Sequence, residues 1–479
     1  MHPLSVSVIL VLVACSSPPA NVRYVDADAT GHGDGSSWAD AHPSLKEALQ
    51  AAREGEMLWV AEGRYTPSDS ARDVAFELKA DVAIYGGFNG TERRLADRDF
   101  EQHRAILSGH IGDADDREDN SYHVVWADSV EASAVLDGFT IEGGYASGPY
   151  PHNLGGGVFV ISASPTLRNL VIRNNHAAKS PEGRDGFGGG MLAAQDSAPL
   201  LQRVWFERNT SAGGGGGMAN KVRASPRLEE VVFVENEAVM LGGGMTNDRQ
   251  SAPVLYRVDF IRNRAEYSGA IDNYIDADAR LYNVRFLGNR ASEYGGAMTN
   301  DTDSDVLVVN GLFVGNVAEN ATKAGAGAVQ NNSSTTRLVG VTLAHNTAAD
   351  GADAIGHREG GHVDVVGSIV TGHAEPLADE GAEQLRVKGT SVEADLQWTT
   401  LPSPGTDGAW GTADDDYGDF RHWEGVVPHI TPERFPADLD DLDADGDTTE
   451  VVAFDLGGIS RFTDGSSTAG AFHRSSNTP

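Results

Sequence analysis

"GGGM" occurs at residues 188–191, 215–218 and 242–245 of this chain, and the near copy "GGAM" at 295–298. Glycine loses much conformational freedom when it is ordered, so a recurring glycine run needs a reason in the backbone. The apolar residue that closes each copy recurs at Val158, Met191, Met218, Met245, Ile271, Met298, Val329 and Ile355. The steps between these positions are 33, 27, 27, 26, 27, 31 and 26 residues. The chain is therefore a repeat array, which predicts a stack of similar units.

Three further columns of residues keep the same step. A Phe-x-x-Asn phrase ends at Asn209, Asn236, Asn263, Asn289 and Asn316, with degenerate copies at Asn175 and Asn346. A leucine precedes the phenylalanine by five residues at Leu201, Leu228, Leu255 and Leu281. A second asparagine follows the apolar closer by two residues at Asn220, Asn247, Asn273, Asn300 and Asn331. Several columns in one period exclude chance similarity.

Within one unit the pattern is that of β-strands. In "SAPVLYRVDFIRN" (251–263), Val258 and Phe260 alternate with Arg257 and Asp259, which is the strand period. Leu255 breaks the alternation, so we expect a bend before Val258. A unit of roughly 27 residues is too small to close a domain, and its short strands must stack on the next unit. A coil of parallel strands, rising ~4.8 Å per rung, satisfies this requirement.

The coil gives each column a physical role. The phenylalanines would stack inside it. The asparagines would occupy a turn, where their amides bond the next rung and where asparagine tolerates left-handed backbone angles. The glycines would form a corner at which any Cβ would collide with the neighbouring rung.

The charge of the chain limits its partners. Lys and Arg number 36 and Asp and Glu number 70, which gives a net charge of −34. Such a surface repels nucleic acid, and it also repels anionic lipids and acidic polysaccharides unless a cation mediates. Solubility, salt tolerance or recruitment of divalent cations would each explain it. The single cysteine excludes a disulfide framework.

The N-terminus, "MHPLSVSVILVLVACSS" (1–17), indicates export. Its apolar core is too short to span a membrane and suits a signal peptide. The ending "LVAC" (12–15) resembles a bacterial lipobox, which implies removal of residues 1–14, lipidation of Cys15 and a short tether over 15–22. Serines after Cys15 favour the outer membrane. An ordinary cleaved signal with a stray cysteine is the alternative.

Three parts of the chain resemble known families. The repeats over 155–357 resemble polymorphic outer-membrane protein repeats, and 23–67 resembles the opening of exported pectin-lyase-like proteins. The segment 405–474 resembles the tail of choice-of-anchor Q domain proteins, bacterial surface proteins of mostly unknown activity. It departs from them at "TAGAFHR" (468–474), where an acidic ending is usual. These resemblances imply an all-β, right-handed, single-stranded parallel β-helix, a solenoid.

A short N-terminal helix should close the open end of this coil. Ser44 is a suitable N-cap for a helix through "LKEALQAAR" (45–53), Gly55 would end it, and "MLWVAEG" (57–63) reads as a strand. Irregular first rungs follow at 83–92, 105–113 and 135–144. The expected organisation is a signal peptide (1–14), a lipidated tether (15–22), a cap with first rungs (23–110), the repeats (111–372), and C-terminal rungs with an acidic tail region (373–479).

Acids and tyrosines recur near the second asparagine column. Glu266 and Glu293 each precede a tyrosine, whereas Asp272 and Asp301 flank their asparagines on opposite sides and so belong to different columns. The candidate glycan-contacting residues are Glu266, Tyr267, Glu293, Tyr294, Asp272 and Asp301. Glycosidases need two carboxyl groups ~5–9.5 Å apart, which stacked rungs could supply. Ordinary loop acids are the alternative, and no catalytic motif identifies a catalytic residue.

One acidic segment could bind a cation. "DLDADGDTTE" (441–450) presents Asp441, Asp443, Asp445, Asp447 and Glu450, and calcium binds such oxygen ligands. An EF-hand would need its glutamate two positions later, so an acidic turn remains open. No other cofactor is expected.

The sequence favours a cell-surface-anchored β-helical lipoprotein that acts as a non-catalytic adhesion or glycan-contacting module. The alternatives are a polysaccharide lyase or glycoside hydrolase acting in the groove of the helix, and a passive envelope or stalk protein. The expected partners are the outer membrane, through the lipid anchor, and extracellular polysaccharide or surface proteins.

Overall fold

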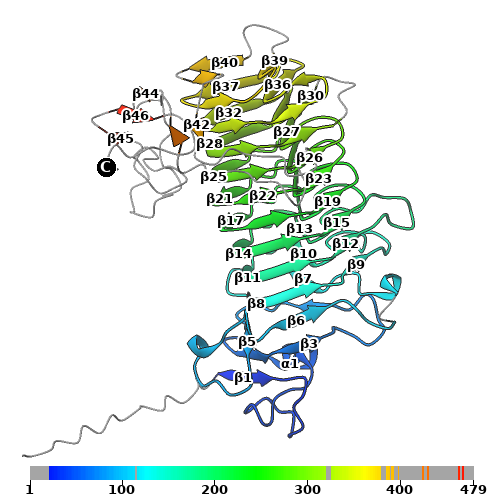
Figure 1. Ribbon diagram of the computed structural model, residues 1–479. Coiled ribbons are helices and arrows are strands. Elements are labelled where there is room, and N and C mark those ends of the chain that lie inside the picture. Colours follow the sequence, from blue (N-terminus) through cyan, green and yellow to red (C-terminus); the bar gives the residue numbers. More distant parts are fainter. Residues whose placement is uncertain are drawn as a thin grey trace, which may run out of the picture.

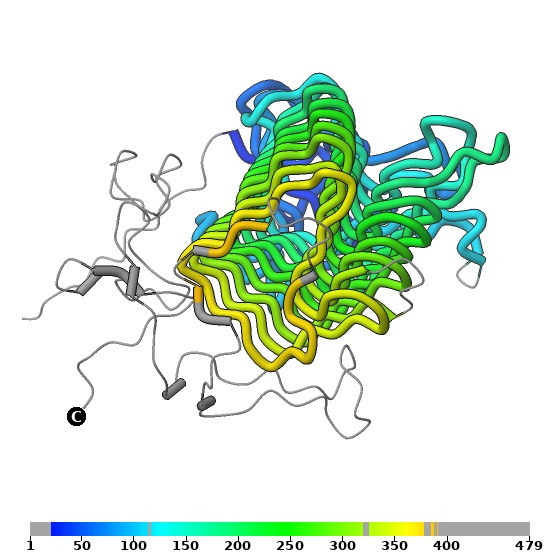
Figure 2. Tube along the Cα trace, turned by 90° about the horizontal axis from the view of Figure 1, so that it is seen from above, coloured from blue at the N-terminus to red at the C-terminus, as the bar shows by residue number. Residues whose placement is uncertain are grey.

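The computed structural model describes residues 21–113, 116–319, 325–378, 385–388 and 390–392, together with five short strands farther along the chain. The described residues up to Val392 wind into one long coil of parallel strands (Figure 1). Seen from above, successive rungs of the coil nearly superimpose (Figure 2). Three sheets, here called A, B and C, run along the coil, and a regular rung contributes to each of them in the order B, A, C.

Sheet B contains the strands that follow the glycine corners. Its eleven strands are β4 (Phe76–Glu77), β7 (Val125–Asp128), β10 (Val158–Ile161), β13 (Met191–Ala194), β16 (Met218–Lys221), β20 (Met245–Asp248), β24 (Ile271–Tyr274), β27 (Met298–Asp301), β31 (Val329–Asn332), β36 (Ile355–Arg358) and β39 (Leu377–Ala378). The apolar closers identified in the sequence begin most of these strands. They pair in register, as Met218 does with Met245 and Met245 with Ile271.

Sheet A contains the Phe-x-x-Asn strands. Its twenty strands are β1 (Val22–Val25), β2 (Met57–Ala61), β3 (Gly63–Tyr65), β5 (Ala83–Phe88), β6 (Ala105–Ser108), β8 (Val135–Glu142), β11 (Thr166–Arg173), β14 (Leu200–Glu207), β17 (Arg227–Glu229), β18 (Val232–Val234), β21 (Val254–Tyr256), β22 (Asp259–Ile261), β25 (Arg280–Leu287), β28 (Asp305–Val314), β32 (Thr335–Val339), β33 (Thr342–Ala344), β37 (His362–Val366), β38 (Ile369–Thr371), β40 (Leu385–Lys388) and β41 (Ser391–Val392). The expected bend before Val258 is present, because Arg257 has a left-handed φ of 54°.

Sheet C consists of two-residue strands. They are β9 (Tyr145–Ala146), β12 (His176–Ala177), β15 (Thr210–Ser211), β19 (Glu237–Ala238), β23 (Arg264–Ala265), β26 (Arg290–Ala291), β29 (Val317–Ala318) and β34 (Thr347–Ala348). The connection from sheet C to sheet B varies in length from rung to rung. It is short between β15 and β16 and long between β12 and β13, and the long loops project from one side of the coil (Figure 2).

The remaining elements lie outside the three sheets. They are the strand pair β30 (Gly325–Ala326) and β35 (Gly351–Ala352), the 3₁₀ turns η1 (Leu95–Asp97) and η2 (Arg117–Asp119), and the antiparallel strands β42 (Gln397–Trp398), β43 (Trp423–Glu424), β44 (His429–Ile430), β45 (Phe462–Thr463) and β46 (Ser466–Thr468).

The N-terminal end of the coil is closed by one short helix. Helix α1 (Leu45–Ala51) begins after Ser44, whose hydroxyl accepts a hydrogen bond from the backbone N–H of Glu47. Leu45 and Leu49 are buried in the same apolar cluster as the coil interior. The helix is shorter than the sequence predicted, because the chain turns to an extended conformation at Ala52, before Gly55. The cap itself is confirmed.

The interior of the coil is a stack of identical side chains. Phe206, Phe233, Phe260, Phe286 and Phe313 are fully buried, and their rings stack with centroid separations of 4.5–5.1 Å. This spacing matches the distance between adjacent strands of a sheet. Each rung therefore repeats the packing of the rung before it.

Buried asparagines hold the turn between sheet A and sheet C. The Oδ1 of Asn263 accepts hydrogen bonds of 3.0 Å from the backbone N–H and the side-chain amide of Asn236. Its Nδ2 donates to the carbonyl of Phe233 and to Oδ1 of Asn289. The continuous column is Asn175, Asn209, Asn236, Asn263, Asn289, Asn316 and Asn346. We call it the asparagine ladder; it links the turns of successive rungs.

A second column of asparagines lies inside sheet B and ends differently from the prediction. Asn220, Asn247, Asn273 and Asn300 donate to one another at 2.7–2.8 Å. Asn331, predicted as the fifth member, does not receive the next bond. The amide of Asn300 instead donates to Oγ1 of Thr336, which donates in turn to Oδ1 of Asn331, both at 2.6 Å. A residue of sheet A thus completes the column.

The glycine corners have the steric cause expected of them. Gly215 has a left-handed φ of +64°. A Cβ on Gly217 would lie 2.6 Å from the carbonyl oxygen of Gly244 and 2.7 Å from the ring of Phe233. Real Cβ atoms do not approach so closely, so glycine is favoured here, although later rungs place alanine at this position, as Ala270 and Ala297. The position before it stays glycine in Gly216, Gly243, Gly269 and Gly296, and a Cβ on Gly216 would lie 2.5 Å from the carbonyl oxygens of Glu237 and Gly243.

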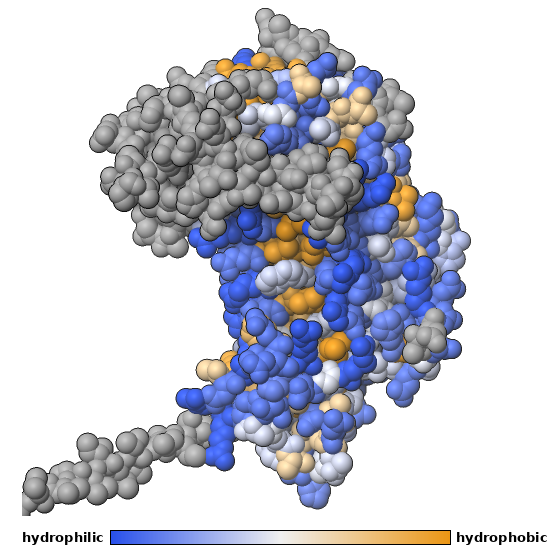
Figure 3. Space-filling model, in the orientation of Figure 1, coloured by the Kyte–Doolittle hydropathy of each residue, from blue (hydrophilic) through white to orange (hydrophobic). Residues whose placement is uncertain are grey.

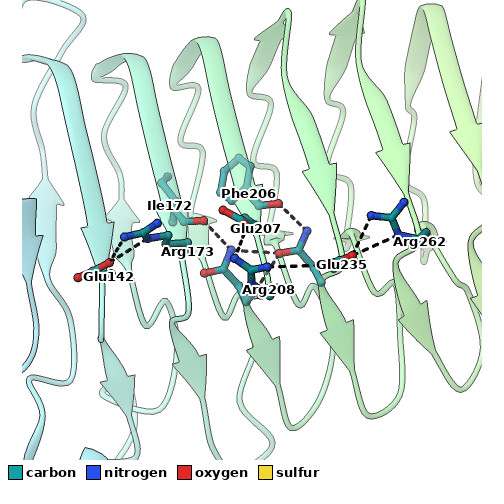
Figure 4. Close-up of polar contacts among 10 residues, drawn as sticks. Glu142, Ile172, Arg173, Phe206, Glu207, Arg208, Glu235 and Arg262 are labelled. Atoms are coloured by element: carbon teal, nitrogen blue, oxygen red, sulfur yellow. Dashed lines mark hydrogen bonds and ion pairs between the residues drawn. The ribbon is translucent and has the colours of Figure 1, made fainter. Parts of the chain in front are cut away.

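The outside of the coil is mainly hydrophilic, with a few hydrophobic groups along it (Figure 3). Ion pairs link neighbouring rungs beside the asparagine ladder (Figure 4). Arg173 contacts Glu142 at 2.9 Å, and Arg262 contacts Glu235 at 2.8 Å. Arg208 lies between Glu207 and Glu235 and contacts both.

Candidate functional site

The candidate site is the outward side of sheet B over strands β20, β24, β27 and β31. Strand geometry sends alternate side chains inward and outward, so the residues beside the buried asparagines of this sheet point outward. Register places them in two columns. The first column is Thr246, Asp272, Thr299 and Gln330, and the second is Asp248, Tyr274, Asp301 and Asn332. Asp272 and Asp301 therefore lie on adjacent rungs but in different columns, as the sequence predicted.

The loops before sheet B enclose this surface along one edge. The hydroxyl of Thr299 donates to the carbonyl of Tyr267 at 3.0 Å, and the hydroxyl of Thr246 donates to that of Leu241 at 2.8 Å. These bonds hold the loops against the outward column. Because the loops cover the outward column, the polar side chains of this column are buried even though they lie outside the apolar core.

Asp272 is the most perturbed group of the site. It is 3% exposed, and its Oδ2 accepts a hydrogen bond of 2.7 Å from the hydroxyl of Ser268. Its other oxygen, Oδ1, is buried without a hydrogen-bond partner. Burial raises the pKa of Asp272 to about 7, with smaller contributions from the charges of Asp301 and Asp248. Around neutral pH this carboxyl group is therefore both a proton donor and a proton acceptor.

The two neighbouring carboxylates differ from it in their partners. Asp248 is 6% exposed and contacts Nζ of Lys221 at 2.8 Å, while its Oδ1 has no hydrogen-bond partner. Asp301 is half-buried; burial raises its pKa, and hydrogen bonds from Thr302 and Asn332 oppose that rise. The site thus contains two buried acceptor oxygens, one on Asp248 and one on Asp272, that accept no hydrogen bond.

Tyrosines border the carboxylates. Tyr274 stands between Asp248 and Asp301 in the second column and is 38% exposed. Tyr267 and Tyr294, on successive loops, stack with their ring centroids 5.4 Å apart. A flat aromatic surface beside hydrogen-bonding groups is the usual composition of a site for an amphipathic ligand.

The glutamates predicted with these tyrosines lie on the loops. Glu266 and Glu293 are half-buried, and the backbone N–H of Glu293 donates to the carbonyl of Glu266 at 2.7 Å. Arg264 and Arg290, from the same two rungs, both contact Glu319, at 3.2 and 2.8 Å. The sequence did not single out Glu319.

Sequence reasoning missed three members of the site: Lys221, Ser268 and Gln330. Lys221 occupies the column of Asp248 one rung earlier, so the period itself could have identified it. Ser268 lies in a loop whose path the period does not fix. Gln330 is fully buried and donates to Asn332 at 2.8 Å.

Two predicted sites lie outside the described residues: the lipidated Cys15 and the acidic segment with Asp441, Asp443, Asp445, Asp447 and Glu450. In the part of the chain that the structure describes, no three histidine, cysteine or acidic side chains are grouped to hold a metal ion. No helix in that part is long and apolar enough to cross a membrane.

Comparison with known proteins gives structural likenesses at low sequence identity. No protein-family model matches the chain, and no curated protein matches it. Among solved structures it is similar to the pectate lyase Pel9A, at 12% identity and a TM-score of 0.31, covering 77% of this chain and 79% of that one. It is also similar to XylC in complex with xylose, at 8% identity and a TM-score of 0.35, covering 94% and 98%. The predicted all-β fold, a parallel β-helix with a short N-terminal cap, is confirmed by the strand pairing and by helix α1 of this chain itself.

Proposed function

We propose that the outward side of sheet B binds a neutral glycan chain without cleaving it. The observation that carries this proposal is the pair of buried carboxylate oxygens, Oδ1 of Asp248 and Oδ1 of Asp272, that lack a donor beside an exposed tyrosine. Sugar hydroxyl groups are donors, and hydrogen bonds to charged acceptors are among the stronger ones. The apolar face of a sugar ring packs on an aromatic side chain such as Tyr274.

The charge of the protein selects the kind of glycan. With a net charge of −34 and three carboxyl groups at the site, a polymer of uronic acids would be repelled. A chain of uncharged sugars would meet no such penalty. The site spans four rungs of one sheet, so an extended chain can follow the columns.

Binding assays on a glycan array, followed by calorimetry on each hit, test this proposal. Asp272→Asn and Tyr274→Ala should each weaken binding of a neutral glycan roughly tenfold or more, since a hydrogen bond to a charged group contributes about 1.5–3 kcal/mol. Trp205→Ala provides the matched control, because Trp205 is 46% exposed on sheet A. The proposal fails if no neutral glycan binds, or if the control weakens binding as much as the site variants. In that case the coil is better explained as a passive stalk.

A glycoside hydrolase is the second candidate function, and the raised pKa of Asp272 favours it. A protonated carboxylic acid at neutral pH is the general acid of such enzymes. Asp301 lies one rung and two residues away, which places the two Cα atoms about 8 Å apart from a strand spacing of ~4.8 Å and a rise of ~3.3 Å per residue. Both side chains point outward, so their carboxyl groups are expected at a similar separation, which lies within the ~6.5–9.5 Å of an inverting enzyme. A lyase is less favoured, because Lys221 is ion-paired with Asp248.

Incubation of every bound glycan with the protein distinguishes binding from hydrolysis. Release of reducing ends, abolished by Asp272→Asn, would establish catalysis, and the anomer formed first would show whether it inverts. Unchanged glycan after prolonged incubation supports the non-catalytic module.

We further propose that the chain is exported and anchored to the outer membrane through Cys15. The lipobox-like "LVAC" and the resemblance to choice-of-anchor Q and polymorphic outer-membrane repeat proteins support this proposal. Cys15→Ala should release the protein from the detergent phase into the aqueous phase. Equal partitioning of both forms would reject the lipid anchor.

The segment 441–450 is proposed as a calcium site on the chemistry of its side chains alone. A cation that binds only the folded protein stabilises it, so a chelator should lower the melting temperature. Asp443→Ala combined with Asp445→Ala should remove that response. A chelator without effect on the parent protein would leave the segment as an acidic turn.

A further inference from the structure

A second group of aromatic and titratable side chains lies on the outward side of sheet B, nearer the N-terminal end of the coil. Trp126, on β7, stands in the same outward column as Asp272 but five rungs earlier. Between these two the column contains, rung after rung, Phe159, Leu192, Ala219 and Thr246. The column therefore changes along the coil from aromatic through aliphatic to polar.

The half-buried Trp126 presents one face of its indole away from the rest of the column. Its neighbours Val125 and Ala127 belong to the coil interior, whereas Trp126 packs against a separate cluster that contains Phe159. The indole stacks on the ring of Phe159 with the centroids 4.2 Å and the planes 14° apart. Since Phe159 lies on the following rung, the other face of the indole is turned toward the preceding rung. The residue paired with Trp126 on that rung is Glu77, which is exposed.

Two histidines beside Trp126 hold each other in a defined protonation pattern. Nδ1 of the buried His123 lies 3.0 Å from the carbonyl oxygen of Gly155, and a carbonyl only accepts, so this nitrogen is the donor. Burial lowers the pKa of His123 to about 3, so near neutral pH the ring is uncharged and its Nε2 is an acceptor. Nδ1 of His152, 3.0 Å from that Nε2, therefore carries a hydrogen and donates it.

This pattern leaves Nε2 of His152 as a fixed acceptor. A neutral imidazole carries hydrogen on one nitrogen only, and Nε2 of His152 has no hydrogen-bond partner among the described residues. The half-buried ring of His152 stacks on Tyr122 with the centroids 5.4 Å apart, and the guanidinium of Arg72 lies 4.3 Å from the centre of the Tyr122 ring. The ring centroids of His152 and Trp126 are 6.2 Å apart. An oriented acceptor thus stands beside the indole.

We propose that Trp126, His152 and Glu77 form a second sugar-binding subsite on sheet B. An uncharged sugar ring packs its apolar face on the indole and donates hydroxyl hydrogens to Nε2 of His152 and to the carboxylate of Glu77. An aromatic surface with a few converging acceptors is the composition that a hydroxyl-rich ligand requires. The subsite rests on the proposed function for the class of its ligand, a neutral glycan, but it shares no residue with the Asp272 site.

The second subsite is separate from the Asp272 site. Five rungs lie between Trp126 and Asp272, which corresponds to about 24 Å at a strand spacing of ~4.8 Å. Leu192 and Ala219, between them, are buried in one cluster with Leu154 from the loop before β10. A short oligosaccharide therefore contacts one subsite at a time, and one chain of the protein can bind two of them.

Calorimetry on the full chain with short, uncharged oligosaccharides of glucose, xylose or mannose tests the second subsite. The parent protein should bind one molecule at each subsite, whereas Trp126→Ala and Asp272→Asn should each lose one of the two. His152→Asn keeps an amide donor for His123 but has no acceptor at the position of Nε2, so it should weaken one of the two sites roughly tenfold. Trp205→Ala, an exposed tryptophan of sheet A, is the matched control and should bind like the parent.

The outcomes distinguish the two subsites from each other. Binding that depends on Asp272 and is unchanged in Trp126→Ala and His152→Asn overturns the second subsite and leaves the proposed function standing. Binding that depends on Trp126 but not on Asp272 supports the second subsite and rejects the Asp272 site. No binding in any of the three sugar series rejects both. Thermal melting shows whether Trp126→Ala is folded; if it is not, His152→Asn decides by its loss of affinity at one site.

Discussion

The asparagine ladder and the carboxylates of sheet B are both rows of buried polar side chains on successive rungs, but they differ in how completely they are bonded. Every amide of the ladder around Asn263 has partners above and below. Asp272 and Asp248 each keep one buried oxygen without a partner. A buried polar group that is satisfied stabilises the fold, whereas one left unsatisfied costs free energy.

This difference distinguishes, within one repeat, the side chains that stabilise the fold from the side chains proposed to bind a ligand. The ladder repeats without change over seven rungs, as a structural device must. The outward column of sheet B changes at every rung, from Asp248 to Tyr274 to Asp301. Perturbed and unsatisfied groups gather at functional sites because a ligand supplies the missing partner.

The largest loss of stability is expected when one member of the asparagine ladder is removed. Asn263→Ala deletes the acceptor of two hydrogen bonds and leaves the carbonyl of Phe233 without its side-chain donor. We expect the free energy of unfolding to fall by about 2–4 kcal/mol, since each unsatisfied buried group costs ~1–3 kcal/mol. Denaturant-induced unfolding measures this loss.

Asn21→Ala is the control for that experiment. Asn21 is exposed and its side chain contacts only the carbonyl of Gly55 among the described residues. Its loss should change stability by no more than ~0.5 kcal/mol. Equal midpoints for the two variants would mean that the ladder does not support the coil.

The opposite result is expected from the carboxylate column. The pKa of Asp272 is raised from 3.8 to about 7, so the folded protein keeps a proton that the unfolded chain releases between these values. Stability should therefore fall as the pH rises from about 4 to 7 and stay low above it. Asp272→Asn removes the charge and should raise stability at pH 8 by about 1–3 kcal/mol.

Thermal melts of both proteins between pH 4 and pH 9 check this prediction. The variant should lose most of the pH dependence in that window while it also loses glycan binding. A variant less stable than the parent at pH 8 would show that the carboxylate has a partner in solution and is not held open for a ligand.

Thr336→Val tests the second column of buried polar side chains, inside the coil. The hydroxyl of Thr336 joins Asn300 to Asn331, and all three are buried. Valine fills the same volume but can neither accept nor donate, so the loss should be about 1–2 kcal/mol. Thr302→Val, on the half-exposed turn, should cost less. Equal losses from the two variants in denaturant melts would contradict a special role for Thr336.

The smallest effect is expected on the outer surface. Glu235→Gln removes the charge that Arg262 and Arg208 contact (Figure 4). Exposed ion pairs contribute about 0–1 kcal/mol, and salt screens them. We expect a loss within that range at low salt and none at 1 M salt. A larger loss would show that the outer ion pairs support the rungs as the ladder does.

The fold could be predicted from the sequence because each column repeats one physical requirement. Phe260 and Asn263 recur with the period, and the glycine corner at Gly217 follows from the same period. The site could be predicted only in part. Register is periodic, so the diagonal relation of Asp272 and Asp301 followed from their offsets from the asparagines. The burial of Asp272 did not, because it depends on Ser268 and on the path of a loop outside the period.

The varying length of the connection from sheet C to sheet B has a consequence for how such a protein changes over generations. The long steps of 33 and 31 residues place their extra residues in this connection, whereas the paired strands keep their register. Insertions here cost little, because loop closure grows only slowly with length. Duplication of a whole rung preserves the stack as well. The scaffold can therefore acquire new recognition surfaces through changes in gene length, without any compensating change in its interior.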